Sequence, residues 1–70
     1  MHMSTISIKF GKKVKAVRLE KDMSQADLAK LLDVHVTYIS GIERGIRNMS
    51  LQNIEKLAKA LKVSVKKLVE

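Results

Sequence analysis

The segment Ser24–Gly45, SQADLAKLLDVHVTYISGIERG, contains two short apolar patterns on either side of a tight break at Asp33. The second pattern leaves small, polar and basic side chains on its outer face. This is the layout of a helix–turn–helix, in which one helix braces another that can lie in the DNA major groove. The sequence therefore predicts such a motif at about residues 25–44.

The remaining sequence predicts an all-α fold of five helices, without a strand, as a single domain over residues 1–70. Apolar residues recur at helical spacing in each of the five segments. The expected helices are Lys9 to Asp22, Gln25 to Leu32, Val36 to Arg44, Leu51 to Leu61, and a short last helix that Ser64 caps and that runs through Val69.

Several residues mark where these helices begin and end. Ser24 is a predicted N-cap, and Asp27, three residues later, completes a pattern similar to a capping box. Ser50 is the predicted cap of the fourth helix. Asp33 stands where the chain must turn sharply, often with positive φ, which Asp tolerates. Gly45 is suited to the left-handed position after the third helix.

The apolar positions predict which faces point inward. In the central pair, one set of residues is expected where the two helices face each other, while a second set shares the outer face of the third helix. The inner set is Leu28, Leu32, Val34, Ile39 and Ile42, and the outer set is Val36, Thr37, Ser40, Gly41 and Arg44. In the fourth helix we expect burial of Leu51, Ile54, Leu57, Ala58 and Leu61.

Composition narrows the class of partner. Fourteen Lys and Arg against seven Asp and Glu give a net charge of +7, which favours a polyanion, either nucleic acid or an anionic membrane surface. No apolar run approaches the roughly 20 residues of a membrane span, and no signal peptide is recognisable. The absence of cysteine fits a cytoplasmic protein. His2 and His35 are too few for a metal site without carboxylate help. We also expect no cofactor and no small-molecule ligand, and Met1-His2-Met3 is assigned no function.

The motifs SQ-x-x-LA, YIS-x-IE-x-G and LAKAL-x-VS resemble those of the lambda-repressor-like (Cro/XRE-type) helix–turn–helix family, over about residues 10–68. The segment TYISGIERGIRNMS is similar to the controller proteins of restriction–modification systems. The resemblance implies a small, dimeric regulator of transcription. Three departures from the family pattern are Asp33 in place of Gly, His35 in place of a Ser/Thr cap, and Val36 in place of a longer polar or basic residue. Val36 can pack against a thymine methyl.

The resemblance also implies which residues contact DNA. Gln25 matches a phosphate-binding glutamine at the start of a helix, where the dipole favours anions. Arginines after the third helix can bind phosphate or guanine. The full set of expected DNA contacts is Ser24, Gln25, Val36, Thr37, Tyr38, Ser40, Gly41, Arg44, Arg47 and Asn48. The alternative is that these are ordinary solvent-exposed residues, that Ser24 is only a cap, and that Tyr38 half-buries its ring against the first helix.

Two further sets of residues are expected to be structural. By position, Arg18 and Glu43 match a family pair that forms a buried salt bridge and fixes the recognition helix. Near the C-terminus, apolar residues have little chain after them to cover them, which suggests either ragged core or a dimer interface. The expected dimer residues are Leu51, Ile54, Val65, Leu68 and Val69.

The sequence thus favours a sequence-specific transcriptional regulator that binds a two-fold operator as a homodimer and, if it activates, touches RNA polymerase. The alternative is an antitoxin-type protein-interaction module that also binds DNA. A basic first helix lying on a membrane is disfavoured by the folded-domain pattern. An enzyme is not expected, because Gly11-Lys12-Lys13 lacks the upstream glycine of a phosphate-binding loop and no metal or cysteine-nucleophile motif is present.

Overall fold

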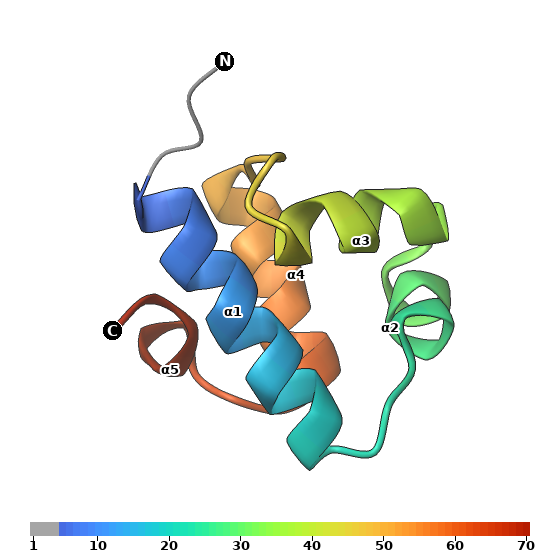
Figure 1. Cartoon of the computed structure of the whole chain (residues 1–70). Helices are drawn as coiled ribbons and strands as arrows, with labels where there is room; N and C mark the ends of the chain where they lie inside the picture. Colours follow the sequence, from blue (N-terminus) through green and yellow to red (C-terminus); the bar gives the residue numbers. More distant parts are fainter. Residues whose placement is uncertain (1–4) are drawn as a thin grey trace.

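The computed structural model describes residues 5–70, so Met1-His2-Met3, to which no function is assigned, lies outside the described residues. Over this range the chain forms five α-helices and no strand, as predicted (Figure 1). The helices are α1 Thr5–Glu20, α2 Gln25–Leu32, α3 Val36–Glu43, α4 Leu51–Leu61 and α5 Val65–Val69.

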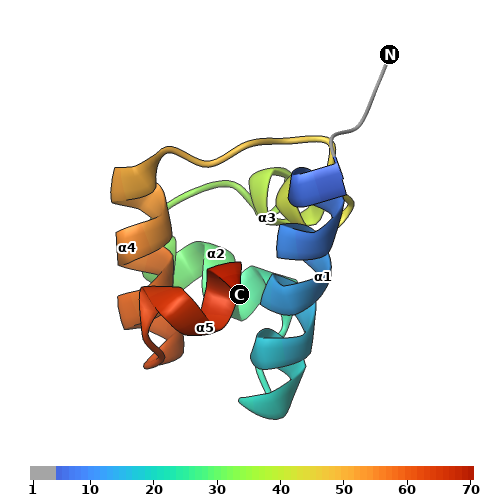
Figure 2. The same ribbon diagram turned by 90° about the vertical axis from the view of Figure 1, so that its left-hand side faces the viewer.

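The five helices pack around one core. Contacts join α2 to α3, α1 to α3, α2 to α4, and α5 to both α1 and α4. Figure 2 shows α5 in front, between α4 and α1, with α2 and α3 behind, so that α3 lies on the opposite side from the C-terminus. The buried apolar residues are Val14, Val17, Leu28, Ala29, Ile39, Ile42, Leu57, Ala58, Leu61 and Leu68. No helix among residues 5–70 is both long and apolar enough to cross a bilayer.

The predicted N-caps of α2, α4 and α5 are confirmed. The Ser24 hydroxyl accepts a hydrogen bond from the Asp27 N–H at 2.9 Å, and the Asp27 carboxylate accepts one from the Ser24 N–H at 2.9 Å, which completes a capping box. Ser50 caps α4 through the N–H of Asn53, and Ser64 caps α5 in the same way. Hydroxyl and carboxylate oxygens thus satisfy donors that each helix start would otherwise leave unpaired.

The first four helices all end in the same way. Asp22, Asp33, Lys62 and Gly45 have φ values of 56°, 56°, 58° and 78°, and each lies just after a helix. In each case the next N–H reaches back to a carbonyl in the last turn, as in the bond from Val34 to Ala29, which is a Schellman motif. The left-handed conformations expected at Asp33 and Gly45 are confirmed.

The predicted bounds of the first helix were wrong. It begins at Thr5 rather than Lys9, and it ends at Glu20 rather than Asp22, because Asp22 is left-handed and turns the chain away. The third helix ends at Glu43, one residue before the predicted Arg44. The second and fourth helices have the predicted bounds.

Two predictions about burial were also wrong. Leu68 was expected at an uncovered end of the chain, yet it is 1% exposed because α5 folds back between α1 and α4. Leu51 was expected to be buried in α4, but it is 85% exposed in the first turn of that helix. Of the inner set in the central pair, Leu28, Ile39 and Ile42 are buried, whereas Leu32 and Val34 are half-buried against the core.

Candidate nucleic-acid interface

The pair expected between Arg18 of α1 and Glu43 of α3 is present and buried. The Arg18 Nε donates to one oxygen of the Glu43 carboxylate at 2.7 Å, and Nη2 donates to the other at 3.0 Å. A third donor, Nη1, reaches the carbonyl of Met23 at 2.7 Å. Hydrogen bonding to Glu43 raises the pKa of Arg18 above its ordinary value, so the guanidinium stays charged. This bidentate contact fixes α3 against α1 and against the turn before α2.

Gln25 belongs to the same network. Its Nε2 donates to Glu43 at 3.1 Å, so the side chain expected on phosphate points, in this structure, to the buried carboxylate. Ser24 uses its hydroxyl as the cap of α2. The N-terminus of α2 and the C-terminus of α3 are therefore linked by side chains. Each buried side-chain nitrogen and oxygen within residues 5–70 has a hydrogen-bond partner.

Gly11 is a positioning residue that the sequence analysis missed. It is buried where α1 crosses α3, and a Cβ there would approach the carbonyl oxygen of Glu43 to 2.7 Å. Any side chain would push the two helices apart, because the obstacle is backbone. The signal in the sequence was an isolated glycine within a helical pattern, which often has a packing reason.

The outer face of α3 carries four of the ten expected DNA contacts. Val36, Thr37 and Arg44 are exposed, and Ser40 is half-buried. His35 is the N-cap of α3, because its Nδ1 accepts from the Thr37 N–H at 3.2 Å and lies 2.9 Å from the Thr37 hydroxyl. A ring nitrogen thus replaces the usual hydroxyl cap. The side chains of Val36, Thr37 and Ser40 are short, so this face of α3 leaves its backbone open to close approach by a ligand.

Tyr38 lies at the edge of this surface and is half-buried. Its hydroxyl accepts a hydrogen bond from Asn53 of α4 at 3.4 Å, and its ring lines a groove with Leu32 and Met49. The expected alternative placed the ring against the first helix, whereas these partners come from α2, α4 and the α3–α4 loop. Tyr38 therefore connects the outer face of α3 to α4.

The loop after α3 lies against α1 and α3. The Ser7 hydroxyl donates to the Asn48 side-chain oxygen at 2.6 Å, so Asn48 braces the loop on α1. The Arg47 guanidinium carbon is 6.0 Å from the centre of the Tyr38 ring. Gly41 was expected on the outer face, but the structure buries it, because the stem of Arg47 covers it. This is a correction to the predicted set of contacts.

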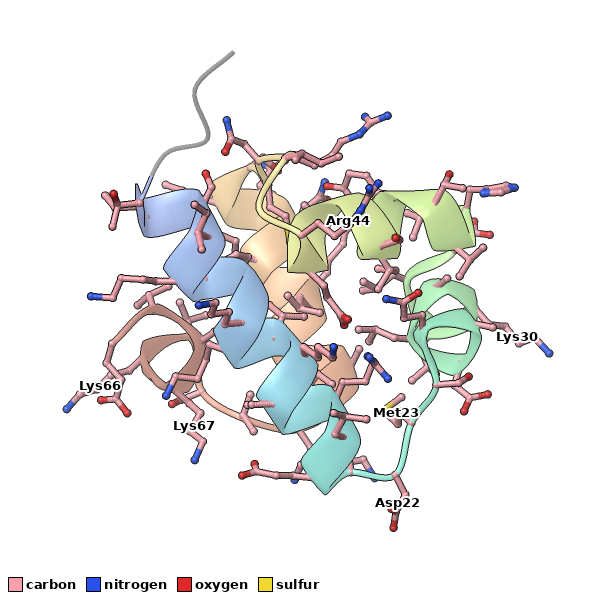
Figure 3. All side chains as sticks on the ribbon, viewed as in Figure 1. Asp22, Met23, Lys30, Arg44, Lys66 and Lys67 are labelled. Atoms are coloured by element: carbon pink, nitrogen blue, oxygen red, sulfur yellow. The ribbon has the colours of Figure 1, made fainter. Side chains whose placement is uncertain are left out.

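The basic side chains are spread over several faces. Figure 3 shows Lys30 projecting from α2 on one side of the view, and Lys66 and Lys67 projecting from α5 on the other. Arg44 lies at the end of α3. Among the described residues, no group of three or more His, Cys, Asp or Glu side chains is placed to hold a metal ion. The concentration of small polar groups on α3, rather than the charge alone, distinguishes this face.

The expected dimer residues divide into two groups. Val65, Val69 and Leu51 are exposed, and Ile54 is half-buried. Leu68 is core and is unavailable to a partner. Ile6, which was not in the expected set, is exposed beside Val69 in a groove of about 170 Å³ between α1 and α5.

Comparison with known proteins shows which family shares this sequence and fold. A family model described as helix-turn-helix (HTH_3) matches residues 14–68. The control protein C.BamHI of Bacillus amyloliquefaciens is 54% identical over 68 residues, which is 96% of this chain and 84% of that protein.

Two solved structures are similar over most of their length. The restriction–modification controller protein C.AhdI from Aeromonas hydrophila has a TM-score of 0.84 and 44% identity, and the match covers 87% of this chain and 92% of that one. The master regulator for biofilm formation SinR, in complex with DNA, has a TM-score of 0.81 and 39% identity, covering 87% and 98%. The five-helix fold is the lambda-repressor-like arrangement.

Proposed function

The chain belongs to the helix-turn-helix family HTH_3, and from this premise we propose that it is a sequence-specific DNA-binding regulator of transcription. Its similarity to control proteins of restriction–modification systems supports that narrower role. The observation that carries the proposal is the exposed, small and polar outer face of α3, held at its inner face by the Arg18–Glu43 pair.

In the proposed complex, α3 enters the major groove. Thr37 and Ser40 offer hydroxyls to base edges, and Val36 offers an apolar contact to a thymine methyl. Arg44 and Arg47 supply charge beside this face for phosphate or guanine. For Gln25 to bind phosphate, its amide must leave Glu43 or share its two donors between Glu43 and the anion.

The net charge of +7 supplies affinity that does not depend on sequence. Because lysines project from several faces, this attraction concentrates the protein near DNA without fixing its register. Base contacts from α3 must therefore supply discrimination. We further propose that the chain acts as a single domain over residues 1–70. We also propose a cytoplasmic location, because a regulator of transcription shares a compartment with DNA.

We propose a homodimer on a two-fold operator, with recognition helices about 34–36 Å apart. The exposed apolar side chains of Leu51, Val65 and Val69, together with Ile6, are the support for a self-association surface. A single exposed apolar residue is common and needs no explanation. Here four such residues lie on the first turns of α1 and α4 and on α5, and together they give a candidate contact area. Activation of transcription would require a further contact with RNA polymerase, and repression would require only occlusion of a promoter.

Selection of bound sequences from random duplex DNA tests the function. The expected result is a palindromic consensus, and recovery of no consensus would refute sequence-specific binding. Replacing Thr37 and Ser40 together by alanine should weaken binding to the consensus while nonspecific binding stays nearly unchanged. Lys67→Ala, on the opposite side of the molecule, is the control. An equal loss on both DNAs in the double variant would refute base recognition by α3.

Sedimentation of the free protein tests the assembly. A dimer is expected at micromolar concentration, and Leu51→Ser with Val69→Ser should shift it toward monomer without unfolding it, because both side chains are exposed. A strict monomer of the unmodified chain at high concentration would rule out the two-fold model, while leaving DNA binding by a single domain to be judged from the selection experiment.

A further inference from the structure

We infer that Gly41 is a positioning residue for Arg47. Arg47 is thereby held beside the outer face of α3, with Val36, Thr37 and Ser40, and is not a free loop cation. The inference rests on the proposed function and deepens it. It assigns to Gly41 no contact with DNA. Its role is to leave open the space through which the Arg47 side chain runs.

The first observation is the fit of the two side chains. A Cβ built on Gly41 would lie 2.6 Å from the Cγ of Arg47, 3.5 Å from its Cβ and 3.7 Å from its Cδ. The three nearest atoms all belong to Arg47, so its aliphatic stem lies directly on the helix backbone. Two carbon atoms of residues that are not linked do not approach to 2.6 Å, so the Cγ of Arg47 must move, and rotation about the Cα–Cβ bond of Arg47 can move it. Any other residue at position 41 therefore displaces Arg47.

The second observation is where the guanidinium lies. Its central carbon is 6.0 Å from the centre of the Tyr38 ring, at the outer limit of a cation–π contact. The ring itself is held, because it is half-buried and its hydroxyl is bonded to Asn53. The stem on Gly41 and the head beside Tyr38 together direct the donors of Arg47 along the surface of α3.

The backbone on both sides of Arg47 is also held. Before it, the N–H of Ile46 donates to the carbonyl of Gly41 at 3.0 Å, and Gly45 is left-handed with φ 78°. After it, the side-chain oxygen of Asn48 accepts a hydrogen bond from the Ser7 hydroxyl of α1, which ties this part of the loop to α1 through a side chain rather than through the backbone. The residue that covers Gly41 is thus part of a loop that is bonded to Gly41 itself. Holding an arginine in its binding conformation reduces the entropy lost when it binds.

A substitution at Gly41 can distinguish an effect on the position of Arg47 from an effect on the stability of the fold. It lies within α3, where glycine is a poor helix former and alanine is the best. If only the Arg47 stem opposes a Cβ, Gly41→Ala should melt at or above the temperature of the unmodified protein, because the stem can swing into solvent. The same change should lower affinity for the selected DNA about ten-fold, which corresponds to about 1.4 kcal/mol. Stability and binding should therefore change in opposite directions.

The test has one arm without DNA. By proton NMR of the free protein, the Cδ and Nε protons of Arg47 should show shifts caused by the Tyr38 ring, and Tyr38→Leu should abolish them. Gly41→Ala should abolish them as well. If Arg47 of the unmodified protein shows no such shifts, or if they persist in Gly41→Ala, the inference is overturned, whatever the protein does with DNA.

The second arm measures binding to the selected duplex for Gly41→Ala, Arg47→Ala and the double variant. The double variant should bind no more weakly than Arg47→Ala alone, because the glycine acts only through the arginine. Ala16→Gly, at an exposed position of α1, is the reverse control and should lower the melting temperature without changing affinity.

The outcomes are distinct. Additive losses in the double variant, unchanged affinity of Gly41→Ala, or a melting temperature clearly below that of the unmodified protein would each overturn the inference. Failure of the unmodified chain to select any sequence would refute the proposed function instead, and the NMR arm would still decide whether Gly41 positions Arg47.

Discussion

Removing the carboxylate of Glu43 should have a large effect on stability. The side chains of Arg18 and Glu43 are 7% and 3% exposed, so Glu43→Ala leaves a guanidinium that water reaches poorly. Two charged hydrogen bonds are lost from Arg18, and the amide of Gln25 loses its acceptor. Breaking such a buried pair typically costs about 3–5 kcal/mol.

That magnitude is comparable with the whole stability of the domain, since a core of this size seldom supplies more than about 3–5 kcal/mol. Glu43→Ala should therefore be substantially unfolded at 25 °C. Urea unfolding followed by far-ultraviolet circular dichroism gives the free energy of unfolding for variants that remain folded. Glu55→Ala, which removes an exposed carboxylate from α4, is the matched control and should change it by no more than about 0.5 kcal/mol.

A double replacement separates the charge from the packing. Arg18→Met with Glu43→Leu removes both charges and keeps apolar volume, and replacement of a buried ion pair in this way is often neutral or stabilising. The double variant should be more stable than either single variant. If Glu43→Ala unfolded within about 0.5 kcal/mol of the unmodified protein, the argument that this pair fixes α3 would be refuted.

Three other measurements follow from the structure. Leu68→Ala should lower the free energy of unfolding by about 2–5 kcal/mol because the side chain is fully buried, whereas Leu31→Ala, at an exposed position outside the proposed dimer surface, should lower it little; equal losses would contradict the assigned burial. Hydrogen bonds from the backbone and hydroxyl of Ser24 lower the pKa of Asp27 below 3.8, so the stability that the carboxylate contributes is complete above that value and is lost as the pH falls through the folded-state pKa. In melting temperatures measured between about pH 2 and 6, Asp27→Asn should therefore reduce the fall at the acid end. An unchanged fall would count against the capping box. Arg47→Ala should reduce the slope of log affinity against log salt by about one if Arg47 contacts phosphate, with Lys66→Ala as the unchanged control, and an unchanged slope in both would rule out the phosphate contact.

Local signals predicted the central motif well. The capping pair Ser24 and Asp27 fixed the start of α2, and Asp33 marked its end, because these interactions span only a few residues. The predicted partnership of Arg18 with Glu43 came from family resemblance, and composition alone would not have indicated it. Similarity in sequence therefore supplied one long-range contact that periodicity could not.

The errors concern contacts between distant parts of the chain. Leu68 is covered by α1 and α4, and no local pattern near the C-terminus indicates that cover. Gly41 has the spacing of the outer face, but a residue of the following loop covers it. The start of α1 lies four residues earlier than predicted, where Ser7 bonds to Asn48 across the fold. In each case tertiary packing decided what helical spacing left undetermined.

The crossing of α1 and α3 at Gly11 has a consequence for the divergence of such regulators. Because backbone meets backbone there, the inner side of α3 is constrained by the frame, while Val36, Thr37 and Ser40 are not. Under the proposed function, exchange of these three residues would retarget the protein to another operator in a few mutational steps, with the scaffold inherited intact. A change at Gly11 offers no such route, since it would alter how every outer residue meets the double helix at once.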